Sequence, residues 1–229
     1  MEHEPVVCKG LCRCIVKEAG NLTEFWNSDI TEASWNGLQE LSKEIDFVLI
    51  GGWAAYLYTK LQKSKDIDIV IDYTALRVME SAYKLSKNDR LRKYEIKLEK
   101  YDVDIYLPSY SVLTVPPKDI LRKYNTSVEG FDVATAEALL ALKLGAASDR
   151  GNTSKGQKDK IDILGILFYA RPDLQKLKAM LGEYDKLSYI ELLKSTLAGF
   201  DLNSLGYLNL NKNSFSKLKK EYLEELKDL

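Results

Sequence analysis

The chain has 229 residues, of which 29% are charged, and its formal net charge is −1. This length suffices for one sizeable core, or for one α/β domain with a helical appendage. The nearly balanced charge provides no global basic field for a nucleic-acid substrate, which argues against a template-directed polymerase. The chain contains no run of about 18 apolar residues and no signal-peptide pattern, so we expect a cytoplasmic protein without a membrane partner.

The first 35 residues form an N-terminal segment for which the sequence predicts no definite structure. Cys8, Cys12 and Cys14 lie close together there, near His3, the single histidine of the chain. An odd, clustered set of cysteines is unlike a disulfide framework, and its spacing departs from that of zinc sites. We therefore expect no metal in this segment, and we expect no catalytic triad with histidine as the general base.

A strand followed by two glycines is the first feature with chemical meaning. A helix over residues 33–44 leads into the short apolar run 47–50, which predicts a buried strand. Gly51 and Gly52 follow, and then helical spacing resumes. Backbone N–H groups at such a helix start can approach a phosphate closely, although a glycine pair by itself is also a common turn.

Two carboxylates alternate with isoleucines on the next predicted strand. Successive side chains of a strand point to opposite faces, so Asp66 and Asp68 share one face while Ile67 and Ile69 are buried on the other. Paired carboxylates repel each other unless a cation lies between them, and Mg²⁺ prefers such oxygen ligands. An isolated Asp-x-Asp could equally be the solvated face of an edge strand.

The strands that follow supply a third carboxylate. We predict a helix over residues 74–84 capped by Thr74, a loop over 87–93 and strands over 94–99 and 101–107. Alternation in the second of these strands places Asp102 and Asp104 on one face. Either of them is available to complete the acidic site.

The second half of the chain is predominantly helical. A short helix over 116–124 and a strand over 127–133 precede helices over 134–148, 158–169, 172–181, 188–197 and 214–227. We expect a flexible loop over 148–156 beside the active-site mouth, and we expect the last helix to dock on the protein's own bundle. The fold class is therefore α+β, a small mixed sheet flanked by helices and followed by a C-terminal helical bundle. We assign residues 1–35 to the N-terminal segment, 36–133 to the sheet domain and 134–229 to the helical domain.

These motifs together resemble the DNA polymerase β-type nucleotidyltransferase superfamily. That family has a glycine pair opening a helix, an acid-x-acid on the next strand and a third acid on a later strand. The matching segments are Gly51-Gly52-Trp53-Ala54, Ser64-Lys65-Asp66-Ile67-Asp68 and Val103-Asp104-Ile105. The small members are the most similar, both the aminoglycoside and lincosamide enzymes and the abortive-infection type toxins. A helix with an internal Lys143 and a following Lys158-Asp159-x-x-Asp162 is similar to the toxin-like members.

The resemblance implies a role for each matching residue. Asp66, Asp68 and Asp104 would form a site for Mg²⁺ or Mn²⁺, with Asp104 also activating the acceptor hydroxyl. The glycine pair would cradle the triphosphate and Ser64 would donate its hydroxyl to a phosphate oxygen. Some relatives carry an arginine near this serine, where this chain has Lys63 and Lys65. Further candidates for nucleotide binding are Lys65, Lys143 and Lys158, although lysines on the polar stripe of a helix are also ordinary.

The implied activity is metal-dependent transfer of a nucleoside monophosphate from a nucleoside triphosphate to an unidentified hydroxyl acceptor. The acceptor classes are a small molecule, a protein or a tRNA, and the toxin-like class is favoured, with an antitoxin as a candidate partner. The first alternative is an antibiotic-type small-molecule nucleotidyltransferase with an acidic pocket for a cationic acceptor. The second is a catalytically inactive nucleotide-binding or protein-interaction module of the same fold.

Overall fold

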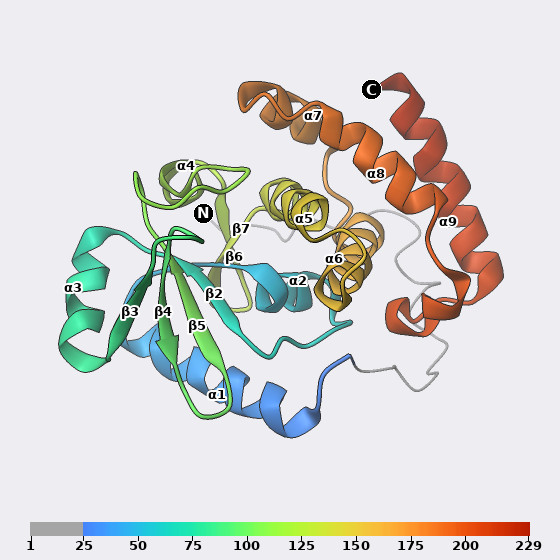
Figure 1. Ribbon diagram of the computed structural model, residues 1–229. Helices are drawn as coiled ribbons and strands as arrows, with labels where there is room; N and C mark the ends of the chain where they lie inside the picture. Colours follow the sequence, from blue (N-terminus) through green and yellow to red (C-terminus); the bar gives the residue numbers. More distant parts are fainter. Residues whose placement is uncertain (1–24) are drawn as a thin grey trace, which may run out of the picture.

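A seven-stranded mixed sheet forms the centre of the protein in a computed structural model that describes residues 25–229 (Figure 1). The strand order is β3-β4-β5-β2-β1-β7-β6. The strands are β1 (Val48–Ile50), β2 (Ile67–Val70), β3 (Leu85–Asn88), β4 (Lys93–Lys97), β5 (Asp102–Tyr106), β6 (Asn125–Val128) and β7 (Phe131–Ala134). The helices are α1 (Ser28–Glu44), α2 (Gly51–Thr59), α3 (Tyr73–Ala82), α4 (Pro117–Arg122), α5 (Ala136–Arg150), α6 (Ser154–Gly165), α7 (Leu174–Glu183), α8 (Ser188–Ala198) and α9 (Lys212–Glu225). The predicted α+β class, with a mixed sheet and a C-terminal helical region, is confirmed.

The register of the central strands follows from alternation of apolar and acidic residues. Strand β2 pairs antiparallel with β1 and parallel with β5, and Asp68 lies opposite Asp104. Ile67, Ile69 and Ile105 are fully buried. A shift of either strand by one residue would bury the acids and expose the isoleucines, so the hydrophobic pattern specifies this register.

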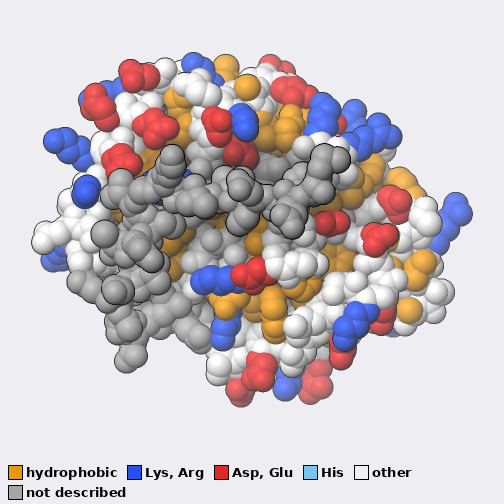
Figure 2. Space-filling model, turned by 180° about the vertical axis from the view of Figure 1, so that it is seen from behind, with side chains coloured by type: hydrophobic (Ala, Val, Ile, Leu, Met, Phe, Trp, Pro, Cys, Tyr) orange, Lys and Arg blue, Asp and Glu red, His pale blue; other side chains and the backbone are white. Residues whose placement is uncertain are grey.

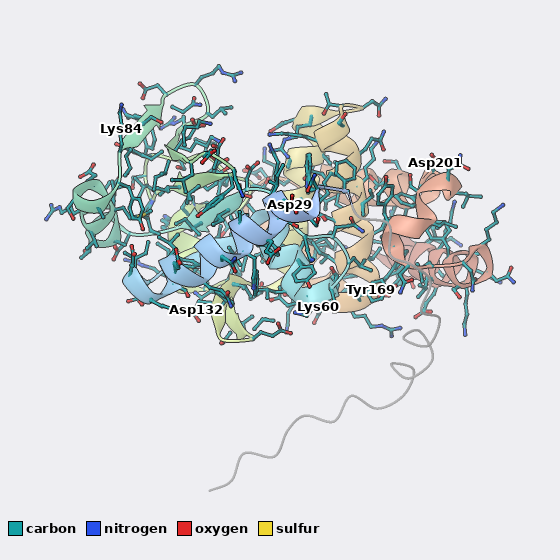
Figure 3. The ribbon with its side chains drawn as sticks, turned by 90° about the horizontal axis from the view of Figure 1, so that it is seen from below. Asp29, Lys60, Lys84, Asp132, Tyr169 and Asp201 are labelled. Carbon is teal, nitrogen blue, oxygen red and sulfur yellow. The ribbon has the colours of Figure 1, made fainter. Side chains whose placement is uncertain are left out.

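Aromatic side chains join the sheet side of the molecule to helix α1, which crosses in front of the sheet when seen from below (Figure 3). The buried indole of Trp53 on α2 donates a hydrogen bond of 2.8 Å to the Ser34 hydroxyl on α1. Its ring lies 4.9 Å from that of Trp35. Helix α2 also packs against α5 and α6, so it lies at the junction between the strands and the later helices.

The later helices cover one another on the side of the molecule away from β3 (Figure 1). Helix α5 packs against α6, α7 and α8, and α9 packs against α8. Leu218 and Tyr222 of α9 and the following Leu226 are buried. The Tyr222 hydroxyl donates a hydrogen bond of 2.7 Å to the Leu167 carbonyl. The prediction that the last helix docks on the protein's own bundle is confirmed.

One predicted strand was wrong because turn chemistry outweighed the apolar pattern, and one predicted loop is shorter than expected because strand pairing includes its two ends. The single strand predicted over 127–133 is a hairpin of β6 and β7, and its turn residues Glu129 and Gly130 both have positive φ. The loop predicted over 87–93 contains the end of β3, which pairs antiparallel with β4. Lys93, placed in that loop by the sequence, is the first residue of β4.

Helix boundaries also differ from the predicted ones. Helix α1 begins at Ser28 rather than at residue 33, because Asn27 caps it. Helix α3 is capped by Asp72 and not by Thr74. Helix α5 ends at Arg150 and α6 begins at Ser154, which reduces the loop expected over 148–156 to three residues. The end of α6 continues as a π-helical turn over Ile166–Ala170.

Charge is mixed, rather than gathered by sign, on the described part of the face seen from behind (Figure 2). The face seen from behind carries lysines, arginines and acids interspersed with apolar side chains (Figure 2). Over residues 25–229, none of the helices combines the length and the apolar character needed to cross a bilayer. The cysteine cluster at Cys8, Cys12 and Cys14, with His3, lies outside the described residues.

The corrected cap of α3 leads to a stability prediction. The Asp72 carboxylate accepts hydrogen bonds of 2.8 Å from the backbone N–H groups of Thr74 and Ala75. Asp72→Ala should therefore lower the free energy of unfolding by about 1 kcal/mol in urea denaturation. Thr74→Ala is the matched control and should leave it unchanged or slightly raised, since alanine favours helix. Equal losses in the two variants would contradict this assignment of the cap.

Candidate active site

Helix α2 begins at a backbone position that only glycine occupies comfortably. Gly51 has a φ of 69°, and a Cβ placed on it would collide with the carboxylate of Asp68. A Cβ on Gly52 would crowd the hydroxyl of Ser64. The backbone at the start of α2 thus lies directly against two of the predicted site residues. This close approach explains why two glycines follow the first strand and open α2.

The structure brings most of the predicted site residues into one small cavity. Its volume is about 80 Å³. The sheet side contributes the three acids and the segment before β2, and helices α5 and α6 form the opposite wall. The lining residues are Trp26, Gly52, Ser64, Lys65, Asp66, Asp68, Asp104, Lys143, Arg150, Lys155, Lys158, Asp159 and Asp162.

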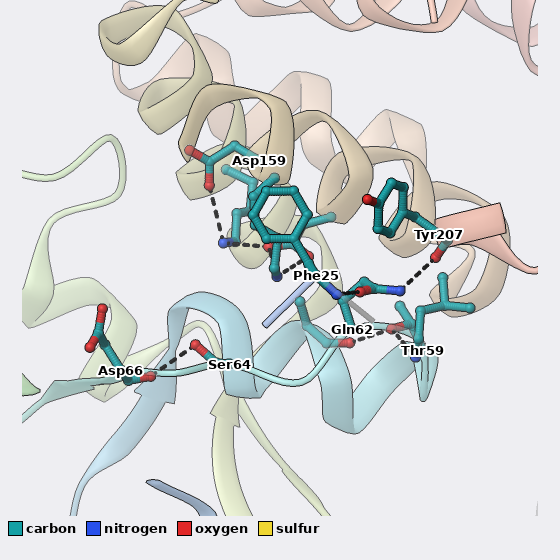
Figure 4. Close-up of polar contacts among 12 residues, drawn as sticks. Phe25, Thr59, Gln62, Ser64, Asp66, Asp159 and Tyr207 are labelled. Atoms are coloured by element: carbon teal, nitrogen blue, oxygen red, sulfur yellow. Dashed lines mark hydrogen bonds and ion pairs between the residues drawn. The ribbon is translucent and has the colours of Figure 1, made fainter. Parts of the chain in front are cut away.

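Short polar contacts hold the segment that leads into β2. The Ser64 hydroxyl donates a hydrogen bond of 2.9 Å to the backbone carbonyl of Asp66 (Figure 4). The Asp66 carboxylate accepts from the backbone N–H of Asp102 at 3.3 Å, and the Lys65 ammonium lies 3.6 Å from it. Lys65 also lies over the ring of Trp26, 5.4 Å from its centroid. Ser64 must therefore release its present acceptor before its hydroxyl can donate to a phosphate.

Of the two candidates for the third acid, only Asp104 faces the cavity. Asp104 lies opposite Asp68 in the parallel pair of β5 and β2. The carboxylate of Asp102 instead forms an ion pair of 2.7 Å with Lys97, whose side chain is 60% exposed. The sequence predicted both acids on one face of the strand. Asp102 is the first residue of β5 and its carboxylate pairs with Lys97, whereas Asp104 lies two residues further along and lines the cavity.

Burial and mutual repulsion disfavour the ionised forms of Asp68 and Asp104. Burial and the charge of Asp104 raise the pKa of Asp68 to about 7, against a lowering influence from Lys143. Burial also raises the pKa of Asp104, although Lys93 beside it acts in the opposite direction. Burial and the charges of Asp68 and Asp104 raise the pKa of Tyr106 well above its ordinary value. Additional positive charge at this point would stabilise all three ionised carboxylates.

Four basic side chains from α5 and α6 line the opposite wall, and three of them are paired with acids. The Lys143 ammonium lies 2.7 Å from Asp162 and 3.2 Å from Asp159. Lys158 contacts Asp162 at 2.7 Å, and Arg150 contacts Asp159 at 2.8 Å. Figure 4 shows Asp159 on this helical side, with Asp66 on the sheet side. The fourth basic residue is Lys155.

These pairs give the two buried lysines opposite pKa shifts. Burial alone would lower the pKa of Lys143, but the charges of Asp162 and Asp159 raise it above its ordinary value. Burial and the charge of Lys143 lower the pKa of Lys158, even though Asp162 opposes this shift. Lys143 is thus held charged and also faces Asp68, whereas Lys158 lies deeper in the cluster.

Several residues of the site were missed by the sequence interpretation. Arg150 follows Lys143 by seven residues, two helical turns, which places both on one face of α5 and could have revealed it. Trp26 and Lys155 come from segments without a motif. Lys93 contacts Asp104 at 2.5 Å but belongs to a predicted loop, so only the pairing of β4 with β5 reveals it.

The donor chemistry of the acids fits a magnesium ion bound together with a phosphate. Within residues 25–229, no three His, Cys, Asp or Glu side chains are already gathered closely enough to hold a metal ion. Mg²⁺ does not need such a cage, since it commonly takes one or two carboxylates and completes its shell with water and substrate phosphates. Asp66 and Asp68 line this cavity and provide that pair, and Asp68 lies against the backbone of Gly51.

A larger cleft of about 660 Å³ lies at the other end of the central strands. Phe47 and Asp72, which flank β1 and β2 at that end, are among its lining residues. It has neither a glycine-opened helix start nor a pair of acids from one strand. Its size suits a small ligand, but the phosphate chemistry predicted from the motifs belongs to the smaller cavity.

Comparison with known proteins extends to fold only. Neither family models nor curated proteins match the chain. The crystal structure of JHP933 from Helicobacter pylori is 16% identical with a TM-score of 0.50, over 89% of this chain and 96% of that chain. An antigenic nucleotidyltransferase-like protein from Paracoccidioides brasiliensis is 18% identical with a TM-score of 0.41, over 73% and 94% of the two chains. The antibiotic-resistance factor ANT(2'')-Ia is 12% identical with a TM-score of 0.46, over 72% and 91%.

The relationship is one of fold. The glycine pair opens α2, the Asp-x-Asp enters β2 and the third acid lies on the neighbouring β5, as in the family pattern. The predicted likeness to the nucleotidyltransferase fold is thereby confirmed. At these identities the likeness does not extend to the reaction or its substrates, so function has to be argued from the site.

The contact between α2 and Asp68 leads to a prediction with a matched control. Gly130 also has a positive φ, but a Cβ placed on it would meet no atom within 4 Å. Gly130→Ala should therefore cost only backbone strain, about 1 to 2 kcal/mol. Gly51→Ala should cost more, by roughly another 1 kcal/mol or above, because of the collision with Asp68.

Urea denaturation of both variants measures the difference. Adding Asp68→Ala to Gly51→Ala should recover the excess loss, since the colliding carboxylate is removed. An equal loss in the two single glycine variants would show that Asp68 moves aside freely and that the close approach is unimportant.

Proposed function

We propose that this protein is a metal-dependent nucleotidyltransferase that moves a nucleoside monophosphate from a nucleoside triphosphate to a hydroxyl acceptor. The observation that carries the proposal is the convergence of Asp66, Asp68 and Asp104 on the glycine-opened start of α2. Burial and the charge of Asp104 raise the pKa of Asp68, and a cation bound there would relieve both effects. A helix N-terminus beside such a cation suits a phosphate.

Each residue has a role in this reaction. Asp66 and Asp68 would hold Mg²⁺ or Mn²⁺, and the bound ion would neutralise charge that develops on the transferred group and on the leaving diphosphate. Backbone N–H groups at Gly51 and Gly52 would donate to the triphosphate. Asp104 is placed to accept the proton of the acceptor hydroxyl. That oxygen forms a bond to the α-phosphorus as the bond to the β-phosphate oxygen breaks, and diphosphate leaves.

The size of the cavity limits which parts of a nucleotide it would hold. A volume of about 80 Å³ holds phosphate groups and an ion but not a whole nucleotide, since nucleotide-sized sites are several times larger. The sugar and base would therefore lie at the rim, near Trp26, Lys65 and Lys155. Lys143 faces Asp68 and is the best placed of the buried lysines to meet the triphosphate.

The basic wall supports the toxin-like class over the antibiotic-type alternative. An enzyme for a cationic acceptor is expected to carry an acidic pocket. The wall facing the three acids instead carries four basic residues against only two acids, namely Lys143, Arg150, Lys155 and Lys158 against Asp159 and Asp162. A protein or tRNA hydroxyl fits such a wall better than a polycationic small molecule does. An antitoxin remains a candidate partner under this proposal. Retention of the acids and both glycines argues against an inactive module.

Incubation with labelled nucleoside triphosphates tests the activity directly. The purified protein, with Mg²⁺, is offered each of the four labelled triphosphates together with itself, total tRNA or cellular protein. Label appearing in one of these acceptors only when Mg²⁺ is present supports the proposal. Absence of transfer to every acceptor, in a protein that binds triphosphate, favours the inactive module.

Replacement of single acids separates chemistry from folding. Asp68→Asn preserves shape and removes one of the repelling charges, so it should abolish transfer while the melting temperature stays unchanged or rises. Asp104→Asn should also abolish transfer, with a smaller loss of triphosphate binding. Asp102→Asn is the matched control, because its carboxylate pairs with Lys97 outside the cavity, and transfer should persist. Activity losses that follow only the folded fraction would mean that the acids are structural.

Metal and triphosphate should bind cooperatively. Paired acids repel a triphosphate unless a divalent cation lies between them, so the affinity measured by calorimetry should be at least tenfold higher in Mg²⁺ than in EDTA, a coupling of about 1.4 kcal/mol. Asp66→Asn should reduce that dependence. Identical affinities in the two conditions would mean that the acids do not bind a metal.

A further inference from the structure

Lys93 is a buried cation directly beside the third acid of the site. Its ammonium lies 2.5 Å from the Oδ2 atom of Asp104 and 3.0 Å from the Oε1 atom of Glu95, and its side chain is 11% exposed. The lysine comes from the first residue of β4, which pairs antiparallel with β5. The contact therefore joins β4, which lies between β3 and β5, to the strand that carries the candidate acceptor-side acid.

The lysine is held in place from its other side. Glu95 accepts a hydrogen bond of 3.0 Å from the side-chain amide of Asn88 on β3, and Lys97 lies 3.5 Å from its second oxygen. Burial alone would lower the pKa of Lys93, but hydrogen bonds and charges from Asp104 and Glu95 raise it above its ordinary value. The ammonium is thus both fixed and kept charged.

Within residues 25–229, only the Oδ2 atom of Asp104 forms an ion pair or hydrogen bond. The Oδ2 atom is occupied by the lysine, so a divalent cation shared with Asp66 and Asp68 would have to use Oδ1 or displace the lysine. The same contact gives a reason why the three acids do not form a metal cage among residues 25–229. It also places a full positive charge next to the inferred metal position, where it opposes the binding of a second cation.

We propose that Lys93 is a positioning residue that fixes the Asp104 carboxylate toward the acceptor and directs the divalent metal to Asp66 and Asp68. The ammonium competes with metal for Asp104, so one acid is reserved for the acceptor hydroxyl. This inference rests on the proposed function for the identity of the reaction. If the role of Lys93 were purely structural, the same ion pair would only hold β4 against β5 and would not change the affinity for metal.

The two readings predict opposite effects on metal affinity. Lys93→Met keeps most of the side-chain volume and removes the charge. A positioning role predicts that the dissociation constant for Mg²⁺, measured by calorimetry with a non-hydrolysable triphosphate present, falls on the order of tenfold, because a nearby positive charge is lost. It also predicts a kcat at least tenfold lower with little change in KM, and partial recovery of kcat in Lys93→Arg.

Lys97→Met is the matched control on the same strand. Lys97 also pairs with Glu95, but it is largely exposed and its second partner is Asp102 rather than Asp104. Its replacement should change neither the Mg²⁺ affinity nor the kcat. If Lys93→Met does not fold, Lys93→Met combined with Glu95→Gln removes the stranded Glu95 charge and still leaves Asp104 without its partner, so the same readouts apply.

Failure of this inference is distinguishable from failure of the proposed function. Wild-type protein that binds no Mg²⁺ with triphosphate overturns the proposed function and this inference with it. Wild-type protein that binds Mg²⁺ and transfers label, beside a folded Lys93→Met variant whose Mg²⁺ affinity is unchanged or weaker, overturns the role of Lys93 alone.

Discussion

Repulsion among three carboxylates held at neighbouring strand positions is the constraint around which the rest of the site is arranged. Parallel pairing of β2 with β5 places Asp68 opposite Asp104, and burial on the other strand face keeps that register. Each nearby cation compensates part of this charge: Lys143 acts on Asp68 and Lys93 on Asp104. Under the proposed function, the remaining repulsion favours the binding of a further cation in this cavity.

The helical half of the chain contributes a rigid basic wall. Buried charges are costly unless they are paired, and here Lys143, Lys158, Asp159 and Asp162 satisfy one another across α5 and α6. Loss of one partner would leave a buried charge without compensation. The ion pairs of Lys143 on α5 with Asp159 and Asp162 on α6 therefore hold the two helices together. Helix α2 packs against both of them and begins at the cavity, so the glycine start, the acids and the wall are parts of one packed unit.

Similarity of fold and proposal of function rest on different evidence. The likeness to JHP933 concerns the path of the chain, at 16% identity. The proposed reaction rests instead on what specific side chains can do: oxygen donors for a hard cation, a helix start for phosphate and an acid beside the acceptor position. The asymmetry introduced by Lys93 is a property of this chain's own β4 strand, and it separates one acid from the other two.

The sequence by itself determined the parts of the site that depend on local periodicity. Alternation in β2 and β5 predicted which acids share a face. The glycine pair predicted a helix start open to a phosphate, and the structure adds that the backbone of Gly51 also lies against Asp68. Alternation alone could not separate Asp102 from Asp104, because it treats both alike, and Asp104 was chosen only by the resemblance to the family pattern. In the structure their partners Lys97 and Lys93 distinguish the two acids. The sequence prediction also merged the hairpin of β6 and β7 into a single strand, since the turn at Gly130 is set by positive φ rather than by hydrophobic pattern. Pairing between distant segments, such as Lys143 with Asp162 and Lys93 with Asp104, was decided by tertiary structure alone, because a charge finds its partner through packing and not through spacing along the chain.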